Sequence, residues 1–242
     1  MPDGGTLVSL QPQSATEALL ARRIEQLRRR ECRRSFLAWC IAALEPYGQT
    51  PAAHHRLLIA ELQAVADGLV DRLMIFMPPG HAKSRYASIL FPLWFMARTE
   101  GQDVIGASYN AELAEDFSLQ AIRLAQENAA TLGYSLLDES RKLWHTSNGG
   151  TYRAAGAGGG ITGRRASLFA IDDPLKGRED ADSDKIRDKV WAWYRAEVVP
   201  RLQPGARVVL IQTRWHEDDL PGRLLAWMGN GGARWRGRDP PP

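Results

Sequence analysis

The stretch FMPPGHAKSRYASILFPLW, residues 76–94, decides the fold predicted for this chain. An apolar run ends at two prolines, a Lys-Ser pair follows, and an amphipathic segment begins there. Phosphate-binding loops have this order, with inward N–H groups, a helix N-terminus, a lysine and a hydroxyl around a triphosphate. The glycines of G-x-x-x-x-G-K-[ST] are missing, because Met77 and Ala82 occupy their positions. Taken alone, the motif fits a strand, turn and helix with a surface lysine equally well.

In a phosphate-binding loop, Lys83 would reach the β- and γ-phosphates of ATP and Ser84 would ligate Mg²⁺. Gly80 supplies one unusual backbone angle, and Ala82 is small enough to let a phosphate approach closely. The predicted ATP-binding residues are Pro79, Gly80, His81, Ala82, Lys83 and Ser84.

A second stretch, SLFAIDDP at residues 167–174, is an apolar strand that ends in two carboxylates. A nucleotide site needs one acid there for the metal and another to orient or deprotonate the attacking water. Asp172 fits the metal role and Asp173 fits the water-activating role. The alternative is that the Asp-Asp-Pro sequence only starts the next turn and helix.

A third stretch, RVVLIQTRWHEDDL at residues 207–220, is a buried strand that ends in Gln212 and Thr213. In a parallel sheet these polar groups lie at the same carboxyl edge as the first two stretches, where ligands gather. There they could sense the γ-phosphate, or they could simply precede a helix. His216 and the acids at 217–219 suggest either a metal cluster or, more simply, a helix start. Three such signals in order favour a P-loop ATPase.

Short apolar runs alternate with longer amphipathic ones, which predicts an α/β fold with a mostly parallel sheet flanked by helices. The fold class expected is a P-loop NTPase of ASCE type, preceded by a helical N-terminal segment. Strands are predicted at 72–77, 103–109, 168–172 and 207–212, and a hairpin with a glycine-rich loop within 146–167. Helices are predicted at 15–44, 52–68, 83–98, 111–129, 182–199 and 218–227. The expected organisation is a basic helical segment (1–50), an ATPase domain (51–228) and a disordered tail (229–242).

The bulk properties are those of an ordinary globular protein, with 44% hydrophobic and 24% charged residues in 242. No apolar run approaches the roughly 20 residues that cross a bilayer. Two cysteines and no secretory signal predict a reduced, cytoplasmic protein. The net charge is +3, and the first 40 residues hold seven arginines against four acids. Such basic ends either contact nucleic acid phosphates or form a solvated helix face.

With the three stretches in view, the chain resembles the N-terminal ATPase half of a large terminase subunit from a tailed bacteriophage. The resemblance covers about residues 70 to 225 and includes the run VIGASYNAELAEDFS. It implies a motor that hydrolyses Mg²⁺-ATP to drive double-stranded DNA into a preformed capsid in a bacterial cell. It also implies a homo-oligomeric ring, a portal protein and a small terminase subunit as partners, and no membrane. Degenerate phosphate loops are common in that family.

The resemblance assigns a role to each residue at the predicted sheet edge. Lys83 and Asp173 become the catalytic residues, while Ser84 and Asp172 hold the magnesium ion. Gln212 and Thr213 become the coupling motif.

Two further assignments follow from the resemblance alone. An arginine usually completes the site in a ring, and Arg164 or Arg165 could act as this finger from a neighbour, or contact DNA phosphates. Adenine recognition lies upstream of the phosphate loop, which makes Gln49, His54 and His55 candidates.

Large terminases normally continue into an RNase H-like nuclease domain, and nothing after residue 225 is expected to supply one. The expectation is therefore a truncated form, or an inactive prophage remnant that folds without turning over ATP. A separate hypothesis is a metal-dependent nuclease that uses Asp172, Asp173 and the acids at 217–219 without nucleotide.

Overall fold

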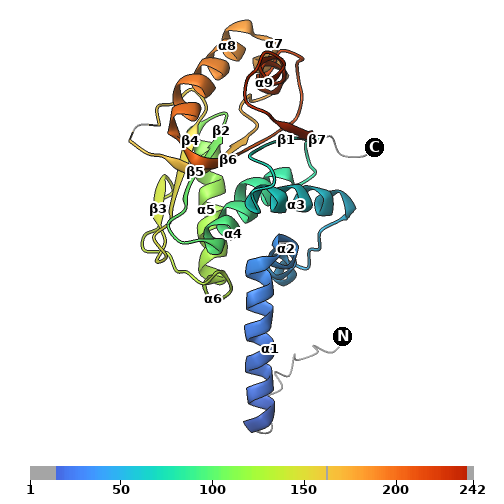
Figure 1. The fold of residues 1–242 in the computed structure, drawn as a ribbon, viewed down its shortest axis with the longest axis vertical. Helices are drawn as coiled ribbons and strands as arrows, with labels where there is room; N and C mark the ends of the chain where they lie inside the picture. The colour runs from blue at the N-terminus through green and yellow to red at the C-terminus, as the bar shows by residue number, and fades with distance from the viewer. Residues whose placement is uncertain (1–14, 162, 239–242) are drawn as a thin grey trace, which may run out of the picture.

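The computed structural model describes residues 15–161 and 163–238, and it is built around a single sheet of seven strands (Figure 1). The strand order is β3-β4-β2-β5-β6-β1-β7, and every neighbouring pair is parallel except β3 and β4. The bounds are β1 Arg72–Phe76, β2 Asp103–Ser108, β3 Leu143–His145, β4 Thr151–Gly156, β5 Ala166–Asp172, β6 Leu202–Gln212 and β7 Arg236–Arg238. The predicted mostly parallel α/β fold is confirmed.

Helices cover both faces of the sheet, which explains the continuously apolar strands. One face carries α2 Phe36–Leu44, α3 Ala53–Ala66, α4 Phe91–Arg98, α5 Ala111–Glu127 and α6 Ala129–Leu132. The other carries α7 Arg178–Asp182, α8 Asp184–Trp193 and α9 Leu220–Gly229 (Figure 1). Each face of the sheet has its own hydrophobic core: the first core lies between the sheet and helices α2–α6, and the second lies between the sheet and α7–α9. Strand side chains alternate between these cores, so that in β1 Leu73 and Ile75 face the first core and Met74 faces the second.

The topology brings three strand ends together. β6 lies between β1 and β5, with Phe76 opposite Gln212 and Asp172 opposite Ile211. The loops that leave these three strands therefore start side by side at the carboxyl edge of the sheet. This is the position at which open α/β sheets bind their ligands.

The single helix predicted over 15–44 is wrong, because the chain breaks at Ser35. Ser35 has an extended backbone (φ −114°, ψ 118°), and its hydroxyl accepts a hydrogen bond from the Ala38 N–H as the cap of α2. The preceding helix α1 (Ala15–Arg34) projects from the body, whereas α2 packs against α3 and α4 (Figure 1). There Trp39 Nε1 donates to the Leu90 carbonyl. Residues 1–14 of the predicted basic segment lie outside the described residues.

The helix predicted over 83–98 begins as expected but is not uniform. A π-helical segment, η2 (Arg85–Leu90), precedes α4. Pro92 has no N–H to donate to a carbonyl one turn earlier, and the helix widens at that turn. Such wide turns are frequent at functional sites.

The other predicted elements need smaller corrections. A hairpin is present, but its first strand β3 lies just before the predicted range 146–167, which contains the turn and β4. The helix predicted over 182–199 is confirmed from Asp184, where α8 begins after the extended Ser183. Beyond α8 the chain continues as the π-helical η3 (Tyr194–Val198) and the short η4 (Val199–Arg201).

The disordered tail predicted for 229–242 is wrong for the residues that the structure describes. Arg236–Arg238 form β7, which pairs in parallel with β1, and the preceding Trp235 is buried. A buried indole anchors this segment, although its composition lacks any periodic pattern. Residues 239–242 lie outside the described residues. Within the described part of the chain, no helix is long and apolar enough to cross a membrane.

Candidate nucleotide site

Lys83, Asp173 and Thr213 meet at the carboxyl edge of the sheet. The Lys83 Nζ lies 2.7 Å from the Asp173 Oδ2 and 3.4 Å from the Thr213 Oγ1. The Thr213 N–H donates to the Asp173 Oδ1 at 2.8 Å, and the Thr213 hydroxyl donates to the Met77 carbonyl at 3.0 Å. Residues from the three predicted motifs thus form one polar cluster. In this cluster the lysine that would bind phosphate is held by a carboxylate.

Asp172 lies beside this cluster and is fully enclosed by protein. Its Oδ2 accepts a hydrogen bond of 2.5 Å from Ser88, which lies one helical turn after Ser84. Burial, followed by the nearby charge of Asp173, raises the pKa of Asp172 to about 6. The hydroxyls of Ser88 and Ser84 act in the opposite direction and lower it. Ser88 was not predicted from the sequence. Its position four residues after Ser84, on the same side of the predicted helix, was the signal that could have identified it.

The donors around Asp172 suit Mg²⁺, which prefers hard oxygen ligands and keeps several waters when it binds beside phosphates. Asp172 would supply a carboxylate oxygen and Ser84 a hydroxyl. Among the described residues, no group of three or more His, Cys, Asp and Glu side chains could hold a metal ion by itself. The site therefore fits a metal that arrives with the nucleotide.

The backbone at this site is unusual at two positions. Outside glycine, Ala82 (φ 53°) and Asp173 (φ 42°) are the residues with positive φ in the described part of the chain. This left-handed region costs a residue with a Cβ roughly 1–2 kcal/mol. Ala82 occupies the place of the second motif glycine, so the loop keeps the glycine conformation without the glycine. Such strain is typical of functional sites.

Replacing Ala82 with glycine should stabilise the protein by about 0.5–1 kcal/mol. The gain is smaller than the strain that is removed, because glycine also increases the entropy of the unfolded chain. Urea unfolding of Ala82→Gly and the wild type measures the difference. Ala181→Gly, at a buried helical alanine, should instead destabilise. Destabilisation by Ala82→Gly would contradict the inference that Ala82 has a strained backbone.

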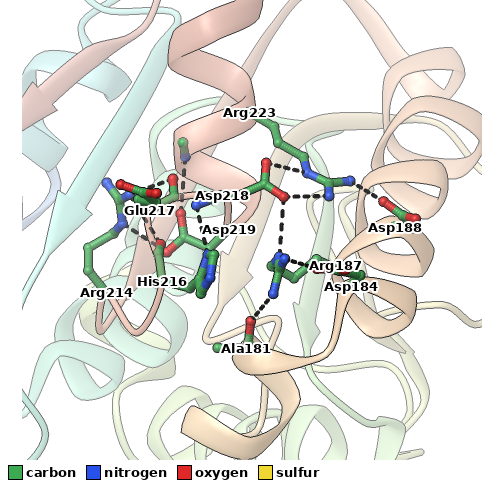
Figure 2. Close-up of polar contacts among 11 residues, drawn as sticks. Ala181, Asp184, Arg187, Asp188, Arg214, His216, Glu217, Asp218, Asp219 and Arg223 are labelled. Carbon is green, nitrogen blue, oxygen red and sulfur yellow. Dashed lines mark hydrogen bonds and ion pairs between the residues drawn. The ribbon is translucent and has the colours of Figure 1, made fainter.

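Asp218 and Asp219 brace and cap the start of helix α9, as the simpler interpretation of a helix start predicted. Asp219 is the N-cap of α9, and its Oδ1 accepts from the Gly222 N–H at 3.0 Å. Asp218 lies between two arginines, 3.2 Å from Arg187 Nε on α8 and 2.7 Å from Arg223 Nη2 on α9 (Figure 2). Arg223 also reaches Asp188 of α8 at 2.8 Å. These ion pairs join α8 to α9.

The comparisons with known proteins identify the family and the fold of the chain. The sequence profile of the family described as "Terminase large subunit, T4likevirus-type, N-terminal" matches residues 74–239. The chain belongs to this terminase family. A solved structure, the large terminase of bacteriophage HK97, superimposes with a TM-score of 0.51 at 13% identity. That similarity covers 74% of this chain but 38% of the HK97 chain, and it shows the fold alone. The search of curated proteins found no match.

Gln212 and Thr213, the residues predicted to form the coupling motif, point to opposite faces of the sheet. Ile211 packs in the first core and Leu210 in the second, so Thr213 faces the phosphate loop and Gln212 faces α8 and α9. The Gln212 Nε2 donates to the Asp219 Oδ2 at 2.7 Å. The pair therefore connects the candidate site to the cap of α9.

Arg214 also belongs to this edge and was missed in the sequence. Its Nε lies 2.8 Å from the Asp219 Oδ2, and its guanidinium lies 5.1 Å from the centroid of the Phe76 ring. The available signal was its position directly after the coupling pair.

Of the candidate adenine contacts, His55 is already engaged inside the protein. Its Nδ1 accepts from the Ala52 N–H at 3.1 Å, so its protonated Nε2 donates to the carbonyl of His81, also at 3.1 Å. Burial, followed by the neighbouring His54, lowers the pKa of His55 and favours this neutral form. His55 therefore braces the phosphate loop. Its ring nitrogens are not free for adenine, while Gln49 is exposed and stays a candidate.

The candidate finger residues Arg164 and Arg165 lie far from Lys83. Both are exposed and directly precede Ala166, which pairs with Leu202 at the amino edge of the parallel strands. The phosphate loop is at the carboxyl edge. Within one chain these arginines therefore do not complete the site, and action on a neighbouring subunit or on DNA stays a prediction.

Proposed function

We propose that this terminase domain hydrolyses Mg²⁺-ATP and couples hydrolysis to movement of double-stranded phage DNA into a capsid. One observation carries the proposal, namely the cluster of Lys83, Asp173 and Thr213 at the ends of neighbouring strands. A phosphate-binding lysine, an acid and a polar sensor are the components that ATP hydrolysis requires. Family membership adds the DNA and the packaging partners.

The ion pair between Lys83 and Asp173 would have to open when a nucleotide binds. An arriving triphosphate offers Lys83 stronger partners than a single carboxylate, so the lysine exchanges Asp173 for the β- and γ-oxygens. Asp173 is then free to orient a water and accept its proton. Ser84 and Asp172 would hold the magnesium ion, which neutralises charge on the phosphates.

Coupling would start at Thr213. Its hydroxyl contacts Lys83 and its N–H contacts Asp173, so both bonds change when the lysine moves. The adjacent Gln212 can transmit this change through Asp219 to α9. We expect a ring of subunits, with the portal protein and a small terminase subunit as partners, and an arginine such as Arg164 or Arg165 acting on a neighbour.

The proposal is tested by Mg²⁺-ATP hydrolysis with and without double-stranded DNA. Turnover by the wild type should be lost in Lys83→Ala, because Lys83 is the cation that Asp173 holds at the proposed phosphate position. Lys185→Ala, an exposed lysine on α8, is the matched control and should keep full activity. Folded wild type that binds no nucleotide would favour an inactive remnant. DNA cleavage that survives Lys83→Ala would favour a nuclease.

A further inference from the structure

Ser108, the last residue of β2, is buried at the site without a partner. Its exposed fraction is 0%, and its hydroxyl has no hydrogen-bond partner among the described residues. Buried hydroxyls are nearly always satisfied, because an unpaired one costs roughly 1–3 kcal/mol. The unpaired hydroxyl of Ser108 therefore calls for a partner outside the protein chain.

The register places Ser108 beside Asp172. The two residues are directly paired across the parallel strands β2 and β5, so their backbones are about 4.8 Å apart. Ala107 and Ile171 point into the second core. Because side chains alternate along a strand, Ser108 and Asp172 both point to the opposite face, toward the helix that follows the candidate phosphate loop.

No direct hydrogen bond joins the Ser108 hydroxyl to Asp172, whose Oδ2 is bonded to Ser88. A water between them would satisfy the serine. Such a water needs two to four polar partners; Ser108 and Asp172 would supply two, and the hydroxyl of Ser84 lies within hydrogen-bonding reach of Asp172.

We propose that Ser108 is a positioning residue whose hydroxyl holds a water of the magnesium hydration shell against Asp172. The inference rests on the proposed function. It gives Ser108 a role toward the magnesium ion and not toward the attacking water. Asp173, the residue proposed to activate that water, turns toward β6, where it contacts Lys83 and the Thr213 N–H. Ser108 lies on the other side of Asp172, on β2.

The test is a magnesium titration of Ser108→Ala with a fluorescent ATP analogue as the probe. The magnesium concentration for half-maximal binding should rise about tenfold, as expected when an outer-shell partner of a metal is lost. Binding of the analogue in EDTA should be unchanged. The metal-free protein should be as stable as the wild type or more stable, because an unpaired buried hydroxyl has been removed.

Ser118→Ala is the matched control, since Ser118 is equally buried but accepts a 3.0 Å hydrogen bond from Trp144 Nε1. This variant should lose stability and keep the wild-type magnesium dependence. An unchanged magnesium half-point in Ser108→Ala, with a wild type that responds to magnesium, overturns the inference alone. A wild type that binds no analogue at any magnesium concentration overturns the proposed function and this inference with it.

Discussion

Asp173→Asn should lower ATP turnover at least about a hundredfold while nucleotide affinity is kept or increased. The amide has the shape of the carboxylate but cannot accept a proton from the attacking water, and general bases contribute about 10²–10⁴ in rate. Affinity should not fall, because the substitution releases Lys83 from the 2.7 Å ion pair and removes a negative charge near the phosphates. Single-turnover hydrolysis and equilibrium binding of ATP separate the two effects.

Asp182→Asn is the control for this prediction. Asp182 is an exposed acid on α7 whose contact with Arg178 is 3.8 Å long, so its loss should change neither turnover nor binding. Turnover by Asp173→Asn within a few-fold of the wild type would show that another group activates the water. A parallel loss of affinity and rate would instead give Asp173 a structural role in holding the lysine.

Asp219→Ala should destabilise the protein by about 2–4 kcal/mol. The Asp219 side chain is fully buried and accepts hydrogen bonds from the Gln212 amide, the Arg214 guanidinium and the Gly222 N–H. Removing it deletes the cap of α9, worth about 1 kcal/mol, and leaves buried donors without an acceptor. The loss stays below that of a fully buried ion pair, because Arg214 can turn to solvent. Urea unfolding measures it.

Asp188→Ala provides the comparison for a surface acid of the same network. Asp188 lies 2.8 Å from Arg223, but its side chain is 69% exposed, so this pair should contribute no more than about 1 kcal/mol. Equal losses in the two variants would contradict the central role of Asp219. Asp219→Asn should fall between them, since an amide oxygen can still cap the helix.

Much of the fold was predictable because the signals are local. Three of the parallel strands, β1, β5 and β6, are apolar runs, and Lys83, Asp172 and Gln212 lie at their ends or in the loop that follows. The long apolar stretch of residues 36–44 hid the break at Ser35, because a single serine cap is a weak signal inside a helical pattern. Likewise, β7 could not be predicted, since its pairing with β1 and the burial of Trp235 depend on distant residues.

The sequence alone determined the chemical components of the candidate site, namely a lysine, two acids and a polar pair, each at the end of an apolar strand. The tertiary structure alone decided their arrangement. Insertion of β6 between β1 and β5 places Thr213 against Lys83 and Asp173, and the pairing of β2 with β5 places Ser108 beside Asp172. These contacts join residues far apart in the chain. Strand order and register fix them, and neither is encoded in any local stretch.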